Sequence, residues 1–237
     1  MTTHRPQRLA GRLSPATMRL AGIAYLCAWI AGLSVFSSST TVSSSGTELF
    51  EQYRGHAVRL AVQFALTEGA AGIALAIVTA GLAARIDDAV LARVVAVCGS
   101  AAAAVSLSQC AIGLYLCAAL VPDRDITALA TASDTLSRLD GLKMTLLAAT
   151  TAALAAAVRR GRIPLPRWTG VLSAATAVSL VASALGYGLL NDTAARAAWL
   201  SLPLLIATVT GSAFLLVRRP GAAPPSGRMA APRNLAD

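Results

Sequence analysis

Three polar residues inside long apolar stretches are the side chains best suited to chemistry. Glu68 lies within VQFALTEGAAGIALAIV, Gln109 lies in a run of small residues, and Lys143 stands near the start of another apolar stretch. A carboxyl group in hydrocarbon is costly unless it is neutral, paired or used. Glu68 therefore indicates either a protonatable group in a pathway for ions, protons or substrate, or a buried carboxyl that holds two helices together.

Depth along the expected helices decides which partners Glu68 can reach. At 1.5 Å per residue, Lys143 lies about 7 Å nearer the outer end than Glu68, a distance that a lysine side chain spans. A Glu68–Lys143 pair requires the second and fourth apolar segments to be neighbours. The simpler interpretation is that Lys143 extends to the outer interface, helped by Asp140 one turn earlier. Gln109 lies at nearly the same depth as Glu68, so these two residues can line one polar cavity.

Six long apolar segments carry these residues and predict membrane-spanning helices. Crossing about 30 Å of hydrocarbon takes roughly 20 apolar residues, and the runs are continuous and about twice the length of β-barrel strands. The sequence therefore predicts an all-α fold, a bundle of six transmembrane helices forming one membrane domain, 17–217. The expected spans are 17–36, 58–84, 91–121, 141–158, 168–190 and 197–217.

The rest of the chain is expected to be short connections and two tails. A basic amino-terminal segment, 1–16, and a disordered tail, 218–237, are both expected in the cytoplasm. Two longer polar connections, SSSTTVSSSGTELFEQYRGH and PDRDITALATASDTLSRLD, are expected to be outer loops. The second has near-helical spacing of charged residues, which also suits an amphipathic cap that leads into the fourth span.

Composition supports the membrane interpretation and argues against nucleic acid. Of the 237 residues, 56% are hydrophobic and only 13% are charged, with a mean hydropathy of +0.64. Soluble domains carry about a quarter charged residues, whereas a lipid-facing surface needs almost none. The net charge of +9 comes from residues at helix ends without interleaved aromatic residues, so no nucleic-acid partner is expected. A single lysine and abundant alanine are typical of a GC-rich bacterial genome.

The distribution of basic residues predicts the orientation. With the amino terminus in the cytoplasm, 14 of the 20 Lys and Arg residues fall in cytoplasmic segments and both termini lie inside. We therefore expect a multi-pass protein of the plasma membrane, the inner membrane of a bacterium. One alternative stays open, because a basic start followed by an apolar run also describes a cleaved signal peptide. The basic residues expected to contact anionic lipids are Arg159, Arg160, Arg162 and Arg167.

Recognised catalytic and metal-binding patterns are missing from the sequence. The four cysteines lie in apolar runs without a CxxC pair, and neither histidine is close to them. No P-loop, GxSxG or HExxH motif occurs. We therefore expect no metal and no cofactor. Only one acidic residue lies deep, whereas intramembrane enzymes normally use at least two cooperating polar groups, which argues against an enzyme without excluding one.

The third expected span carries a stripe of small and polar residues on one face. Small residues let membrane helices approach closely, and a glutamine can donate a hydrogen bond across the contact. We interpret the stripe first as a packing face. Its members are Gly99, Ala102, Ser106, Gln109, Cys110, Gly113 and Cys117.

Two segments resemble a family of small bacterial membrane proteins. RLAGIAYL near the start and PRWTGVLSAATAVSLVASALGY in the fifth expected span are similar to segments of proteins grouped as domain of unknown function number 4386. This resemblance implies a six-helix membrane protein; it implies no activity and no site residues.

The residues themselves support two hypotheses of function. The first is a non-enzymatic membrane subunit or regulator that acts through helix packing on a protein partner in the membrane. The alternative is a small transporter or proton-coupled carrier that uses Glu68, with Gln109 and Lys143 as further members of its site. A lipid-modifying enzyme ranks third.

Overall fold

The computed structural model describes residues 13–36 and 40–216, and these ranges contain helices, turns and no β-strand. Six of the described helices are long and apolar enough to cross a membrane. This confirms the all-α prediction for the described residues. The expectations for the basic amino-terminal segment and for the tail after 217 fall largely outside them.

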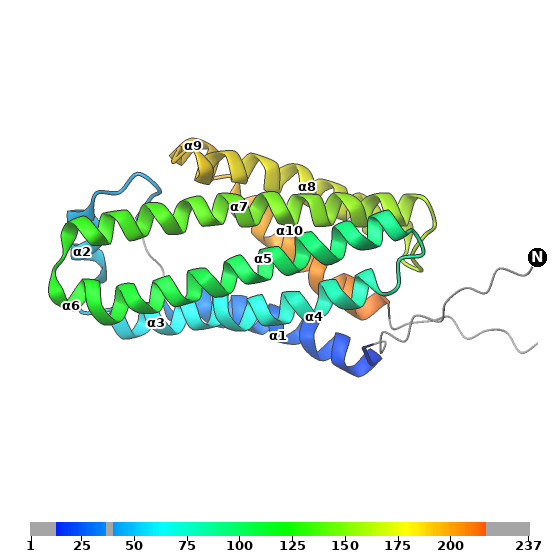
Figure 1. The fold of residues 1–237 in the computed structure, drawn as a ribbon, viewed down its shortest axis with the longest axis horizontal. Helices are drawn as coiled ribbons and strands as arrows, with labels where there is room; N and C mark the ends of the chain where they lie inside the picture. Colours follow the sequence, from blue (N-terminus) through cyan, green and yellow to red (C-terminus); the bar gives the residue numbers. More distant parts are fainter. Residues whose placement is uncertain (1–12, 37–39, 217–237) are drawn as a thin grey trace, which may run out of the picture.

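The six candidate spans alternate in direction along the chain (Figure 1). Some spans combine several helical segments, and a short helix, α2, lies between the first and second. In chain order the segments are α1 (Pro15–Val35), α2 (Gly46–Tyr53), α3 (Ala57–Phe64), π-helical η1 (Ala65–Ala70), α4 (Ala71–Ala83), α5 (Ala89–Tyr115), π-helical η2 (Leu116–Leu120), α6 (Val121–Asp123), α7 (Ile126–Arg159), α8 (Arg167–Gly188), α9 (Asp192–Ala195) and α10 (Ala198–Leu215).

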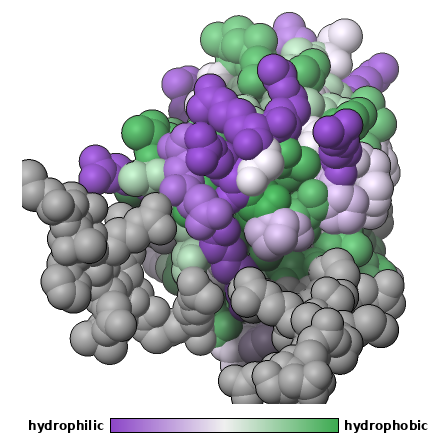
Figure 2. Space-filling model, turned by 90° about the vertical axis from the view of Figure 1, so that its right-hand side faces the viewer, coloured by the Kyte–Doolittle hydropathy of each residue, from purple (hydrophilic) through white to green (hydrophobic). Residues whose placement is uncertain are grey.

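The bundle has two chemically different ends. The basic end holds the turns 84–88 and 160–166, and Figure 2 shows hydrophilic side chains gathered there beside apolar ones. The capped end holds α2, α6 and α9, which lie on the left of Figure 1. Each passage of the chain therefore runs from one of these ends to the other.

Polar residues at the ends of the apolar runs start several of these helices. Ser14 accepts a hydrogen bond from the Thr17 backbone N–H, ahead of a proline at the first helical position. Asp88 caps α5 and Asp125 caps α7 through their side chains. Each cap satisfies backbone donors that have no partner within the helix.

The fourth span is longer than the hydropathy pattern indicates. It was expected over 141–158 after a polar loop, but α7 is helical from Ile126 onwards. The reason is local: Asp125 caps the helix, and Leu129 and Leu136 bury themselves among apolar side chains at the capped end. The other expected loop likewise contains a helix, α2, which begins with a capping box formed by Ser45 and Glu48.

Two apolar clusters fill the bundle, one towards each end. The larger is built around Met18, Val78, Val95, Leu154 and Leu180, and the smaller around Phe36, Leu49, Leu116, Leu129 and Leu136. Along α5 and α7 the two clusters are separated by a short stretch of buried polar residues. We call the set Glu68, Gln109, Asp140 and Lys143 the polar layer.

Small residues bring the helices together, as expected for the stripe on the third span. Gly99 lies against the Thr79 side chain of α4, and Gly113 lies against the Phe64 ring of α3. Gly72 in turn meets Ser106 of α5. The glycines of the stripe therefore face the second span, and any larger side chain at these glycines would push the two spans apart.

Candidate functional site

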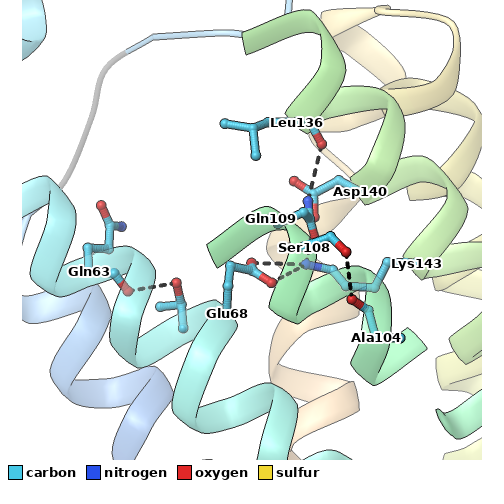
Figure 3. Close-up of polar contacts among 9 residues, drawn as sticks. Gln63, Glu68, Ala104, Ser108, Gln109, Leu136, Asp140 and Lys143 are labelled. Carbon is cyan, nitrogen blue, oxygen red and sulfur yellow. Dashed lines mark hydrogen bonds and ion pairs between the residues drawn. The ribbon is translucent and has the colours of Figure 1, made fainter. Parts of the chain in front are cut away.

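The centre of the polar layer is an ion pair between the second and fourth spans. Lys143 Nζ donates to Glu68 Oε1 at 2.9 Å and to Oε2 at 2.8 Å (Figure 3). Glu68 is 8% exposed and Lys143 is 6% exposed. The expectation that Lys143 extends to the outer interface is therefore wrong. The side chain turns into the bundle because two carboxylates lie there. Their negative charge makes the interior a better environment for an ammonium than an apolar helix surface.

Asp140 also belongs to this layer, whereas the sequence analysis considered it only as a residue that helps Lys143 to reach the outer interface. Its Oδ1 lies 2.7 Å from Lys143 Nζ, and its side chain is 26% exposed. The three N–H groups of the lysine thus meet three carboxylate oxygens. The spacing of three residues between Asp140 and Lys143, which puts both on one face of a helix, is the signal that identifies it.

Gln109 joins the layer from α5, the third span. Its Nε2 donates to the backbone carbonyl of Leu136 in α7 at 3.1 Å, and the residue is 1% exposed. Its Oε1 is buried, and no hydrogen-bond partner for it lies among the described residues. Gln109 therefore binds the α7 backbone on one side and leaves a buried acceptor unsatisfied on the other, which is a costly arrangement.

A local change of helix type sets the direction of Glu68. Residues 65–70 form a π-helical turn within the second span, and a π turn shifts the angular position of the side chains that follow it. Thr67 packs on Gly32 of α1, while Gly69 packs on Cys110 of α5. The carboxylate between them is directed towards α7. Such turns occur frequently at functional sites, and no periodicity in the sequence predicts this one.

Further polar groups surround the layer from other helices. The charges of Glu68 and Lys143 act on Tyr25 of α1, which is 2% exposed. The Ser106 hydroxyl approaches the Glu68 carboxylate from α5. Tyr187 of α8 lies close enough to Asp140 and Lys143 for their charges to act on it. The sequence analysis assigned neither tyrosine to this site; a tyrosine inside an apolar helix, whose hydroxyl needs a partner, is the signal that points to them.

The layer can hold charge and exchange a proton, since its members are carboxylates, an ammonium and neutral acceptors. Within the described ranges no group of three or more His, Cys, Asp or Glu side chains is placed to hold a metal ion. Glu68 and Lys143 are brought together directly, and Gln109 meets the same helix, α7, one turn from Asp140.

The arginines expected to meet anionic lipids all lie exposed at the basic end. Arg159, Arg160 and Arg162 stand at the end of α7 and in the turn after it, and Arg167 opens α8. Arg160 lies 3.7 Å from Asp88, a loose and exposed pair that contributes little to stability.

Fold and site together define a class: a helical bundle with six candidate membrane spans and a buried charged layer across its interior. Comparisons of the chain with family models, curated proteins and solved structures give no match.

Proposed function

We propose that the chain is a multi-pass protein of the cell membrane and acts as a non-enzymatic subunit or regulator through helix packing. The observation that carries this proposal is that the charged groups and several of the hydroxyl groups inside the bundle bind one another. Lys143 binds Glu68 and Asp140, and Thr176 of α8 binds Thr208 of α10. The surfaces that remain available for contact with other molecules are the outward helix faces. They carry exposed apolar side chains such as Leu20 and Val178, which suit lipid and neighbouring helices.

The proposed orientation has both termini in the cytoplasm of a bacterium. The exposed arginines at the basic end support it, because cytoplasmic loops carry an excess of arginine and lysine. These arginines, Arg159, Arg160, Arg162 and Arg167, are also proposed to contact anionic lipid headgroups. The resemblance to proteins of domain of unknown function 4386 belongs to the same proposal, as a shared six-helix architecture.

Thiol labelling of intact cells tests the orientation. In a variant without the four native cysteines, Glu51→Cys lies at the capped end and Arg160→Cys at the basic end. A membrane-impermeant maleimide should label position 51 in intact cells and position 160 only after permeabilisation. The reverse pattern would overturn the orientation.

Affinity purification from native membranes in mild detergent tests the subunit proposal. A protein that works through helix contacts should bring down a partner in constant stoichiometry, and crosslinking before solubilisation should raise its yield. Repeated recovery of the chain alone, in folded form and after crosslinking, would rule the proposal out.

A proton-coupled carrier is the second candidate, favoured by the composition of the polar layer. Two carboxylates share one ammonium, and one of the carboxylates is 26% exposed. In lipid vesicles containing a pH-sensitive dye, the wild-type protein should carry protons after a pH step, and Glu68→Gln should abolish this flux while the helix content is unchanged. Glu51→Gln, which alters an exposed carboxylate, is the control. Wild-type flux equal to that of protein-free vesicles would exclude the carrier.

A further inference from the structure

The polar layer carries one negative charge more than its cation can balance. Glu68 and Asp140 each contact the single ammonium of Lys143, both at hydrogen-bonding distance. With all three groups ionised the layer has a formal charge of −1. An unbalanced charge between two apolar clusters is costly, so the layer gains stability from one further positive charge.

The two carboxylates are not equivalent as sites for that charge. Both oxygens of Glu68 accept from Lys143, and its side chain is 10% exposed. Asp140 contacts the ammonium through Oδ1 at 2.7 Å. At 26% its side chain is also the more exposed. The Asp140 carboxylate can therefore be reached from outside the layer more easily than that of Glu68.

Gln109 supplies the second, independent observation. The Leu136 carbonyl accepts a hydrogen bond from Gln109 Nε2. Within an α-helix each carbonyl points towards the backbone N–H four residues later, so this carbonyl points towards Asp140. The Gln109 amide therefore lies beside Asp140, and Figure 3 shows it reaching from α5 into the layer. Its buried Oε1 lacks a donor among the described residues, and an ionised carboxylate cannot be that donor.

We propose that the polar layer is a binding site for a single exchangeable proton, carried by the Asp140 carboxyl group and donated to Gln109 Oε1. Hydronium at the capped end gives the proton to the Asp140 carboxylate and leaves as water; loss of the proton reverses the step. The protonated carboxyl cancels the surplus charge and satisfies the orphan acceptor at once. This goes beyond the proposed function, since it holds for a subunit and for a carrier alike.

The other titratable groups that face the layer do not take this role. Tyr25 approaches from α1 and Tyr187 from α8, and Cys110 of α5 faces Glu68. Phenols and thiols are ordinarily neutral at neutral pH, so they add no charge there. Lys143 is held by three oxygens, and Glu68 has both of its own occupied. Asp140 is left as the group whose protonation changes the contacts of the layer.

Carbodiimide labelling of the full-length wild-type protein in lipid, mapped by mass spectrometry, is the first test. The reagent modifies protonated carboxyl groups, so we expect labelling at Asp140 and none at Glu68. Labelling at Glu68 alone, or at neither residue over the whole range in which the protein stays folded, would overturn the proposal.

Infrared difference spectroscopy of variants is the second test, and it reports on the partner of the proton. The carboxylic C=O band that appears as the pH falls should be lost in Asp140→Asn and kept in Asp134→Asn, an exposed aspartate on the same helix. In Gln109→Leu the band should shift, because its hydrogen-bond acceptor is gone. A band unchanged in both Asp140→Asn and Gln109→Leu would contradict the assignment. If Asp140→Asn does not fold, the wild-type labelling decides alone.

Sodium ions separate a proton site from a site for monovalent cations. At constant pH, added NaCl should leave the labelling of Asp140 unchanged relative to choline chloride. Protection by sodium but not by choline would mean that the layer takes a metal cation, and would overturn the proton assignment.

Discussion

Lys143 and Glu68 stand 75 positions apart in the chain, yet the ammonium lies 2.9 Å and 2.8 Å from the two carboxylate oxygens. The contact fixes the relative height of the second and fourth candidate spans. A shift of either helix by one turn, about 5.4 Å, would leave the buried Glu68 carboxylate without its cation.

Replacing Lys143 with Met should destabilise the protein more than replacing Glu68 with Gln. The first change leaves the buried Glu68 carboxylate and the partly exposed Asp140 carboxylate without a cation, and breaking a buried pair in this way costs about 3–5 kcal/mol. The second leaves Lys143 paired with Asp140 at balanced charge. Unfolding free energies in mixed micelles measure the difference, with the exposed Arg138→Met as control. Equal losses for the two variants would contradict the arrangement.

Gly186→Ala should destabilise the junction of α8 and α9. A methyl group there would collide with the backbone of Ala194 and Ala195, and a backbone cannot move aside as a flexible side chain does. We expect a loss of about 1–3 kcal/mol, seen as a lower Tm. Gly211→Ala in α10 is the matched control, since nothing lies within 4 Å of the added carbon. A fall in Tm of similar size for both variants would count against this contact.

Thr176→Val should weaken the contact between α8 and α10. Its buried hydroxyl lies 2.8 Å from that of Thr208, and hydrogen bonds between membrane helices contribute about 0.6 kcal/mol on average and up to about 1.7. A double-mutant cycle with Thr208→Val should give a coupling energy in that range. Thr145→Val is the control, because that hydroxyl bonds only to Gly141 of its own helix. A coupling of zero would show that the two hydroxyls act independently.

Acid should loosen α2 through Glu48. The backbone N–H of Ser45 and then its hydroxyl donate to the carboxylate, and they hold the pKa of Glu48 below its ordinary value. A lowered pKa in the folded state means that the cap stabilises α2 above the ordinary pKa and is lost as the pH falls through the lowered one. After correction for the intrinsic exchange rate, the backbone amides of Gly46–Tyr53 should be less protected from hydrogen exchange at low pH than at neutral pH. Glu48→Ala should remove this pH dependence and Glu51→Ala should keep it.

The six long helices could be predicted because hydropathy over about 20 residues is a property of each segment alone. The length of α7 was predicted only in part. The spacing of charged residues in 126–140 suited an amphipathic cap, but the stretch is also polar enough to suggest a loop, and its helix depends on Leu129 and Leu136 packing against other segments. For the candidate site, Glu68 and Lys143 were conspicuous as ionisable residues in apolar runs. Their pairing needed knowledge of which helices are neighbours.

The other members of the site were harder to find for different physical reasons. Asp140 belongs to a polar stretch, so its charge did not stand out until the structure put it 2.7 Å from Lys143. Gln109 was identified, but its partner is a backbone carbonyl. Every residue has such a carbonyl, so the residue types in the sequence could not indicate which one Gln109 binds. The π-helical turn at 65–70 arises from packing on α1 and α5 and has no signature in side-chain periodicity.

At 34 residues, α7 is about 50 Å long, well beyond the roughly 30 Å that hydrocarbon requires. Its first turns lie at the capped end (Figure 1), while Asp140 and Lys143 sit further along the same unbroken helix. Because α7 is continuous, a movement of its first turns would also move Asp140 and Lys143 relative to Glu68. The long helix α7 therefore gives a mechanical link between the surface of the capped end and the ion pair enclosed in the bundle.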